Sequence, residues 1–223
     1  MERILRITGK GEGACPPDTI IVTLTTSGED KNYDKAMQLA DKATLNLKEK
    51  LVKEAGIEEK KIITTDFRVR AVNKYVKKMT ENKYVFDRYE VCHDLTIKFE
   101  FNTKKLAKCV DVIVDSMSEP VFNIDFTVEN SEEMKKQALT MAVNDAKSKA
   151  ELLAESAGVK LGDIVSIDHS FSEINIYRPQ RMRMDYAYEG AIMSKASASA
   201  SMESINVQDI KVNANVTIQW EIE

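Results

Sequence analysis

The sequence predicts an α+β fold in which long helices pack on one face of mixed, largely antiparallel sheets. Segments with β alternation and segments with helical spacing follow one another in the order ββ-α-ββ-α-β-α-β-β, which is typical of this class. In the last helical segment, alanines recur at every fourth position, at Ala138, Ala142, Ala146, Ala150 and Ala154. Because a methyl side chain keeps two backbones only a short distance apart, this stripe predicts a helix lying unusually close to a sheet.

The first half of the chain is divided by its apolar spacing. Strands are predicted at 4–8 and 19–26, and a helix at 32–55 that ends at Gly56. Two long β segments, 62–76 and 84–101, follow around a polar turn.

The glycines Gly9, Gly11 and Gly13 lie between the first two strands in a G-x-G-x-G pattern. A dinucleotide site would need such glycines to open a helix, whereas here Pro16, Pro17 and a strand follow. We therefore expect a bulged hairpin corner at this point.

In the second half, Thr103 is the predicted N-cap of a short helix, and Asn130 or Ser131 that of the alanine-striped helix, which reaches 157 and stops at Gly158. The remaining predicted strands are 121–128, 162–171 and 210–222. We interpret 1–223 as one domain that can be divided into two subdomains, about 1–101 and 102–223. The segment 173–203 is expected to be a long mobile or interface loop, because it lacks apolar periodicity and contains a Ser/Ala run.

Composition excludes several classes of protein. The 223 residues are 43% hydrophobic and 30% charged, with a net charge of −4, which is ordinary for a soluble globular protein and gives no general attraction to nucleic acid. No apolar run is long enough to span a membrane. The N-terminal residues are strand-like and lack the apolar core of a signal peptide, so we expect a cytoplasmic location, or a periplasmic or envelope location if a leader was removed.

No constellation of catalytic, cofactor-binding or metal-binding residues is found, and we expect no enzyme activity and no cofactor. Cys92, His93 and His169 are the nearest approach to a metal set. Neighbours in a strand point to opposite faces, so Cys92 and His93 do not converge on one ion. There is no G-x-S-x-G elbow and no nucleophile with an adjacent base.

The segment around 177–188 combines arginine, methionine and tyrosine, the residue types enriched at protein interfaces. The candidate interface residues are Tyr177, Arg178, Arg181, Met182, Arg183, Met184, Tyr186 and Tyr188. The same mixture of guanidinium and aromatic groups also occurs on surfaces that bind single-stranded nucleic acid. The acidic balance of the chain and the lack of an RNA-binding motif favour protein contact.

Three parts of the chain resemble the SIMPL-domain family, which includes bacterial periplasmic and outer-membrane immunogenic proteins. They are Thr8-Gly9-Lys10-Gly11-Glu12 with Pro17-Asp18, the stretch 142–162 that holds most of the alanine stripe, and the closing strand 210–218. The resemblance implies a mixed α/β fold and a tendency to self-assemble, and it implies no established catalytic residues. Many members have an export signal, and many have Pro-Gly where this chain has Val207-Gln208-Asp209.

From these observations we expect a non-enzymatic, self-assembling soluble protein of SIMPL-like type, active in envelope or stress physiology. We expect a homo-oligomer, and a protein partner is compatible with the same surfaces. The alternative is a binding module for a small molecule or peptide. A single-stranded nucleic-acid binder, acting through 178–183, is the third hypothesis and the least favoured.

Overall fold

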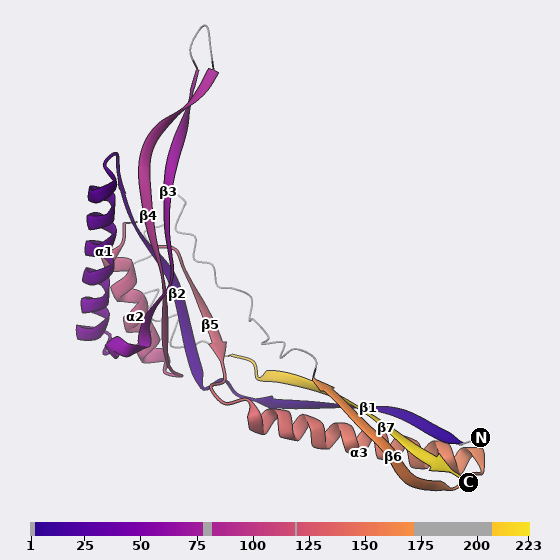
Figure 1. Cartoon of the computed structure of the whole chain (residues 1–223). Helices are drawn as coiled ribbons and strands as arrows, with labels where there is room; N and C mark the ends of the chain where they lie inside the picture. The colour runs from indigo at the N-terminus through magenta and orange to yellow at the C-terminus, as the bar shows by residue number, and fades with distance from the viewer. Residues whose placement is uncertain (1–2, 78–81, 119, 172–206) are drawn as a thin grey trace. The chain divides into compact units, whose positions relative to one another are not determined.

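The computed structural model describes residues 3–77, 82–118, 120–171 and 207–223, and it confirms the α+β class with two antiparallel sheets. The chain forms two compact units (Figure 1). Unit 1 comprises 1–18, 127–179 and 207–223, and unit 2 comprises 19–126 and 180–206. The chain therefore passes from one unit to the other near residues 18 and 127, whereas the sequence suggested a division near 101.

Unit 1 is a three-stranded sheet covered on one face by a single long helix. Its strands β1 (Ile4–Cys15), β7 (Ile210–Ile222) and β6 (Leu161–Phe171) lie in the order β1-β7-β6, with antiparallel pairing. The helix α3 (Glu132–Ala157) packs mainly on β1 and β7. All five alanines of the stripe are buried, as predicted, and the first four share a core cluster with residues of β1 and β7.

The three glycines of β1 fit the alanine stripe of α3 at very short range. A Cβ atom on Gly9, Gly11 or Gly13 would overlap a backbone carbonyl oxygen of α3, that of Ala142, Ala138 or Met134 respectively. Two residues of a strand advance about 6.6 Å and four residues of a helix about 6 Å, so glycines at every second position can follow a helix stripe at every fourth.

The predicted bulged corner at these glycines is therefore wrong. The strand β1 continues through all three of them to Cys15, in unbroken register with β7. The physical reason for glycine here is the close approach of a helix, which leaves no room for a side chain.

The ends of α3 follow the predicted signals with one refinement. Ser131 occupies the N-cap position without a side-chain cap, and Asn130 Oδ1 accepts a hydrogen bond from the Glu132 N–H at 3.0 Å. Gly158 ends the helix with a φ of 69°, a left-handed conformation that favours glycine.

Unit 2 is a four-stranded sheet in the order β3-β4-β2-β5 with two helices. Its elements are β2 (Thr19–Asp30), α1 (Tyr33–Lys53), the short 3₁₀ turn η1 (Glu59–Lys61), β3 (Ile62–Lys77), β4 (Asn82–Glu100), α2 (Thr103–Ser116) and β5 (Phe122–Thr127). The helix α1 packs on β2 and β4 and contacts α2.

Two local features of unit 2 refine the sequence interpretation. The N-cap of α2 is Asn102, whose Oδ1 accepts from the Lys105 N–H at 2.9 Å, so Thr103 begins the helix and does not cap it. Gly28 of β2 repeats the close-packing arrangement of unit 1, because a Cβ there would lie 2.5 Å from the Ala36 carbonyl oxygen of α1.

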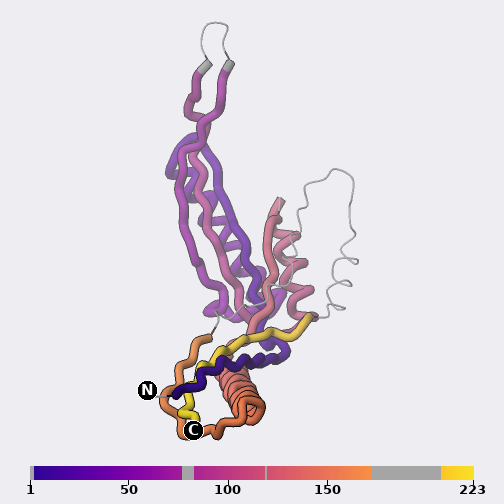
Figure 2. The backbone as a smooth tube through the Cα atoms, turned by 90° about the vertical axis from the view of Figure 1, so that its right-hand side faces the viewer, coloured from indigo at the N-terminus to yellow at the C-terminus, as the bar shows by residue number. Residues whose placement is uncertain are grey.

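The strands β3 and β4 continue beyond the rest of the unit 2 sheet. β2 pairs with β4 only as far as Tyr89, whereas β3 remains paired with β4 up to Lys77 and Asn82. Figures 1 and 2 show this two-stranded ribbon extending past the ends of α1 and β2. In the ranges that the structure describes, no helix is both long and apolar enough to cross a membrane.

Candidate functional site

The interface residues predicted from the sequence, within 177–188, lie outside the described residues, and so does the 173–203 loop. The candidate site is therefore built from the surfaces that the two units present. Two of these surfaces are apolar, and the third is a network of ion pairs.

The first surface lies in unit 1 where α3 leaves β6 uncovered. The pairing of β6 with β7 places Ile164, Ile167 and Phe171 opposite Trp220, Ile218 and Ala214, and hence on the face that α3 covers elsewhere. The β7 residues are buried under the helix, but the three β6 side chains are 52%, 55% and 37% exposed. A single helix spans about two strands of a sheet, so the third strand keeps an open apolar face.

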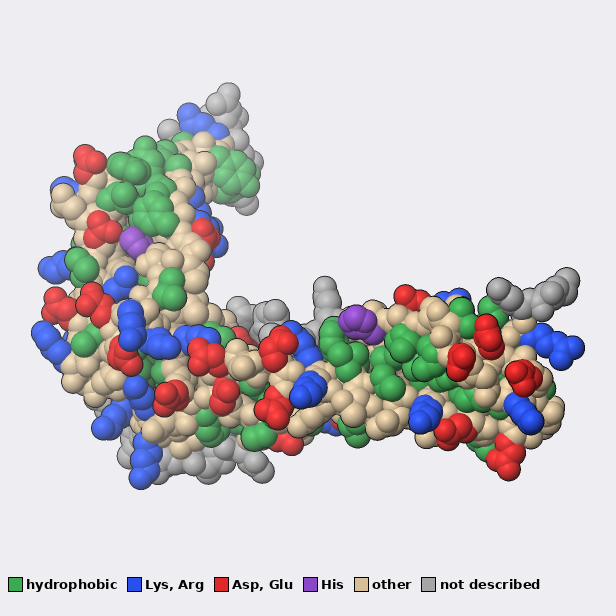
Figure 3. All heavy atoms as spheres, turned by 60° about the horizontal axis from the view of Figure 1, so that its bottom comes forward, with side chains coloured by type: hydrophobic (Ala, Val, Ile, Leu, Met, Phe, Trp, Pro, Cys, Tyr) green, Lys and Arg blue, Asp and Glu red, His purple; other side chains and the backbone are tan. Residues whose placement is uncertain are grey.

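Beside this strand the surface is hollowed. The hollow has a volume of about 380 Å³ and is lined by Leu139, Thr140, Val143 and Asn144 of α3 and by Ile167 and His169 of β6, with Val216 of β7. We call this surface, together with Ile164 and Phe171, the α3–β6 groove. Figure 3 shows hydrophobic side chains gathered in a band on unit 1.

The chemistry of the α3–β6 groove suits contact with apolar surface. Leu139, Val143, Ile167 and Val216 supply aliphatic surface, and Thr140, Asn144 and His169 supply hydroxyl, amide and imidazole groups that can form hydrogen bonds. The groove contains no carboxylate, cysteine or lysine among its lining residues. Four of the seven residues that line the hollow are aliphatic, and the other three carry groups that can form hydrogen bonds.

The second surface is one face of the β3–β4 ribbon in unit 2. It consists of Phe67, Val69, Tyr75, Tyr84 and Phe86, which are 45%, 39%, 51%, 74% and 46% exposed, and we call it the hairpin face. The cross-strand register places all five on the side of the sheet that bears α1.

A β-bulge is what keeps the hairpin face continuous. Along β4, Val91 and Tyr89 face α1, and strict alternation would turn Phe86 and Tyr84 to the other side. The register shifts between Val72 and Asn73, where Asp87 is the extra residue of β4. The shift returns Phe86 and Tyr84 to the α1 face, where the ring centroids of Phe86 and Tyr89 are 4.9 Å apart.

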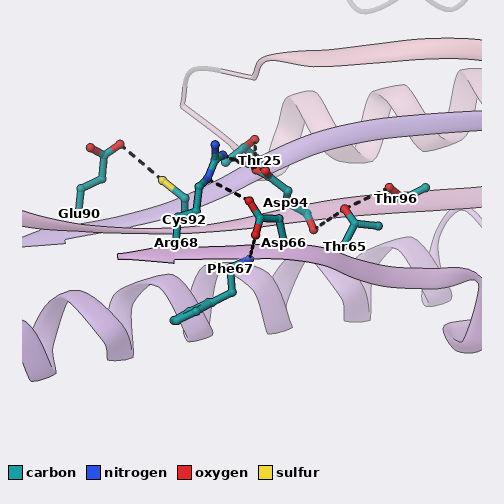
Figure 4. Close-up of polar contacts among 9 residues, drawn as sticks. All are labelled: Thr25, Thr65, Asp66, Phe67, Arg68, Glu90, Cys92, Asp94 and Thr96. Carbon is teal, nitrogen blue, oxygen red and sulfur yellow. Dashed lines mark hydrogen bonds and ion pairs between the residues drawn. The ribbon is translucent and has the colours of Figure 1, made fainter. Parts of the chain in front are cut away.

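The opposite face of the same strands carries a network of ion pairs and hydrogen bonds (Figure 4). Arg68 Nη2 donates to both carboxylate oxygens of Asp94, at 2.9 and 2.8 Å, and Thr25 Oγ1 donates to Asp94 Oδ1 at 2.7 Å. Arg70 Nε lies 2.6 Å from Glu90 Oε2 and holds the pKa of that carboxyl below its usual range. These arginines are already paired, so the face presents a solvated ionic network to its surroundings.

The same network continues toward the end of the ribbon. Lys74 Nζ lies 2.8 Å from Asp87 Oδ1, and Arg88 lies 2.7 Å from both Asp87 and Glu29. The side chains of Lys74 and Arg88 are therefore neutralised locally. Lys83, by contrast, is exposed.

Cys92 and His93 point to opposite faces of β4, as strand alternation predicted. Cys92 Sγ donates to Glu90 Oε1 at 3.5 Å, and burial raises the pKa of this thiol. His93 faces α1, with Nε2 3.4 Å from Asp41 Oδ1 and its ring edge-on to Phe67 at 4.9 Å. His169 belongs to unit 1. In the described part of the chain, no three His, Cys, Asp or Glu residues are grouped so as to hold a metal ion.

Sequence reasoning identified the strands but missed both apolar surfaces. Ile164, Val165 and Ile167 read as an ordinary buried strand, and nothing in the linear sequence says that β6 is the strand left outside the helix. The shared face of the hairpin aromatics could not be read from alternation, because the bulge changes which residues of β4 face α1. The available signal was the presence of three aromatic residues, Tyr75, Tyr84 and Phe86, close together in the sequence.

The fold is that of a small α+β protein with two antiparallel sheets, and each of its two units bears an apolar surface. Residues 5–220 match the SIMPL family, which is described as a protein of unknown function (DUF541). The chain belongs to that family. It is similar to the 26 kDa periplasmic immunogenic protein of Brucella melitensis biotype 1, with 26% identity over 222 residues, 98% of this chain and 84% of the relative. The protein of the same name from Brucella abortus strain S19 matches to the same extent, 26% over 222 residues.

Proposed function

We propose that this protein is a non-enzymatic, self-assembling member of the SIMPL family. The observation that carries the proposal is the α3–β6 groove, an uncovered apolar strand face beside an apolar hollow of about 380 Å³. Contiguous apolar surface of this kind on a monomer marks a site of association. The names of the two relatives, periplasmic immunogenic proteins, support a role in the cell envelope.

The outer edge of β6, with which no strand of the described residues pairs, supports the same proposal. β6 is the outer strand of the unit 1 sheet, and its regular part from Ser166 to Phe171 contains no proline or lysine to discourage pairing with another chain. On the other outer strand, the Lys10 N–H donates to Asp145 Oδ2 at 2.8 Å, so that edge is partly satisfied within the chain.

The experiment is to measure the solution mass of the full chain by light scattering over a range of concentrations. We expect masses above that of the 25.2 kDa chain and a rise with concentration. Ile167→Glu places a charge in the groove and is expected to shift the distribution to monomer. Ser170→Glu is the matched control, because Ser170 is exposed on the same strand and pairs with Asn215 on the other face.

The proposal is overturned if the wild-type chain stays monomeric at all concentrations. It is also overturned if Ile167→Glu and Ser170→Glu assemble equally well. A circular dichroism melt of each variant verifies that it is folded.

The hollow also favours a second candidate function, a binding module for a small apolar molecule or peptide. A ligand that binds only the folded chain raises its melting temperature in proportion to the logarithm of its concentration. Octanoate and a short apolar peptide are suitable probes. A rise that Ile167→Glu abolishes would favour this second function, and no rise with either probe counts against it.

A further inference from the structure

The chain carries two different apolar surfaces, one on each unit. The hairpin face lies on a protruding two-stranded ribbon and is rich in aromatic side chains, whereas the α3–β6 groove is a hollow lined mainly by aliphatic residues. We propose that the hairpin face of one copy docks into the α3–β6 groove of a second copy, so that copies join head to tail. This inference rests on the proposed function, because it names the two surfaces through which self-assembly takes place.

The size of the hairpin face supports a protein contact. Its four aromatic side chains leave roughly 430 Å² exposed if a full aromatic side chain offers about 200 Å². The two most distal aromatics, Tyr75 and Tyr84, pair across the strands with ring centroids 5.3 Å apart. Exposed apolar side chains gathered on one face in this way are typical of an interaction site.

The polar groups of the two surfaces also match. A tyrosine that is buried in an interface needs a hydrogen-bond partner for its hydroxyl group. The residues that line the groove include such partners, because Asn144 and His169 carry hydrogen-bonding groups and the Thr140 hydroxyl can accept, and its aliphatic residues suit the rings.

Charge favours contact between the ribbon and unit 1 of another copy over contact between like surfaces. The ribbon with the carboxylates that pair with it, residues 66–77, 82–94 and Glu29, carries six basic and five acidic residues, a net charge of +1. The described part of unit 1 carries nine basic and thirteen acidic residues, a net charge of −4. Opposite net charges speed the encounter of the two surfaces, and like charges oppose a ribbon-to-ribbon contact.

A head-to-tail contact uses a different surface on each partner, and this allows a mixing experiment that a symmetric contact would fail. Ile167→Glu places a charge in the groove and leaves the hairpin face unchanged. Tyr84→Glu places a charge on the hairpin face and leaves the groove unchanged. Each variant alone is expected to be monomeric, and an equimolar mixture is expected to form a dimer, because the intact hairpin of the first fits the intact groove of the second.

Two controls accompany the mixture. Val76→Glu changes charge by the same amount on the other face of the same ribbon, where Val76 pairs with Lys83, and it is expected to assemble like the wild type. The double variant Ile167→Glu/Tyr84→Glu should stay monomeric when mixed with itself. Sedimentation velocity, with one variant carrying a fluorescent label, measures each mixture, and circular dichroism verifies folding.

The head-to-tail contact is overturned if the wild-type chain assembles but the two single variants do not restore a dimer on mixing. It is also overturned if Tyr84→Glu alone assembles like the wild type. Either result leaves self-assembly itself standing, whereas a wild-type chain that stays monomeric overturns the proposed function and this contact together.

Discussion

The backbone of Gly11 in β1 lies directly against the backbone of Ala142 in α3. A Cβ atom added to Gly11 would lie 2.5 Å from the Ala142 nitrogen and 2.9 Å from the Cβ of Met141. Neither neighbour is the far end of a flexible side chain, so relief requires the helix to move away from the sheet. Where the two elements meet, the strand therefore has glycine and the helix has alanine, the residues with the smallest side chains.

We expect Gly11→Ala to destabilise the chain by about 3 kcal/mol or more, because the added methyl group overpacks a contact between two backbones. Urea denaturation followed by circular dichroism measures the loss. Gly162→Ala is the matched control: Gly162 also lies in a strand of the unit 1 sheet, but it is exposed and its nearest neighbours are 3.2 Å away. If both variants unfold at the wild-type urea concentration, the close approach of β1 and α3 is incorrect.

The close-packed helix could be predicted from the sequence, but the role of the three glycines could not. The alanine stripe predicted a close-packed helix, and all of its members are buried. Gly9, Gly11 and Gly13 recur at every second position, which is the period of a strand, and the alanines of the stripe recur at every fourth. The two periods together were the available signal that this strand packs against this helix. With the following prolines, the same glycines indicated a corner, because glycine is used in turns for its backbone freedom. Glycine is also used where another backbone approaches closely, and the local sequence does not distinguish the two uses.

The candidate surfaces were less predictable, because they depend on strand order and on a bulge. The apolar residues of β6 could be assigned to a strand, but its place at the edge, beyond the reach of α3, is a property of the tertiary structure. The bulge at Asp87 reverses the parity of Phe86 and Tyr84, and no local rule fixes the position of a bulge in a long hairpin.

The buried hydroxyl pair in unit 2 provides a test of hydrogen-bond direction. Thr44 Oγ1 donates to the Ala40 carbonyl oxygen at 2.9 Å, so its single hydroxyl proton is used there, and Thr26 is the donor in the 2.7 Å contact between the two hydroxyls. Thr44→Val therefore leaves the buried Thr26 hydroxyl without an acceptor and is expected to lower the free energy of unfolding by about 1–3 kcal/mol. Thr26→Val leaves Thr44 bonded to Ala40 and should cost less. Equal losses in urea denaturation would contradict this assignment.

Asp145 predicts a pH dependence of stability. Its carboxylate accepts from Lys149 Nζ at 2.6 Å and from the Lys10 N–H at 2.8 Å, and these contacts lower its pKa below the ordinary value of 3.8. The folded chain therefore holds this carboxyl ionised more strongly than the unfolded chain. Its stabilising contribution is present above pH 3.8 and is lost as the pH falls through the lowered pKa.

The measurement is the melting temperature of the wild type and of Asp145→Asn between pH 2 and pH 7. We expect the wild type to be the more stable near neutral pH and the difference between the two to shrink in acid. Asp163→Asn is the control, since Asp163 is an exposed carboxylate of the same unit. A difference that stays constant over this range would show that Asp145 does not act through its charge.

Two of the three cysteines, Cys15 and Cys109, are predicted to differ sharply in reactivity. Cys109 is fully buried in α2, and burial raises its pKa to about 12, so almost no thiolate is present at pH 8 and reagents cannot reach the sulfur. Cys15 is only half-buried, with Sγ 3.3 Å from Met134 Sδ, although burial and Asp18 raise its pKa as well. Iodoacetamide labelling of the native chain, read by mass spectrometry, should modify Cys15 first and Cys109 only as fast as the chain unfolds. Addition of urea should make the two rates similar, and early labelling of Cys109 in the native chain would mean that α2 is not packed as described.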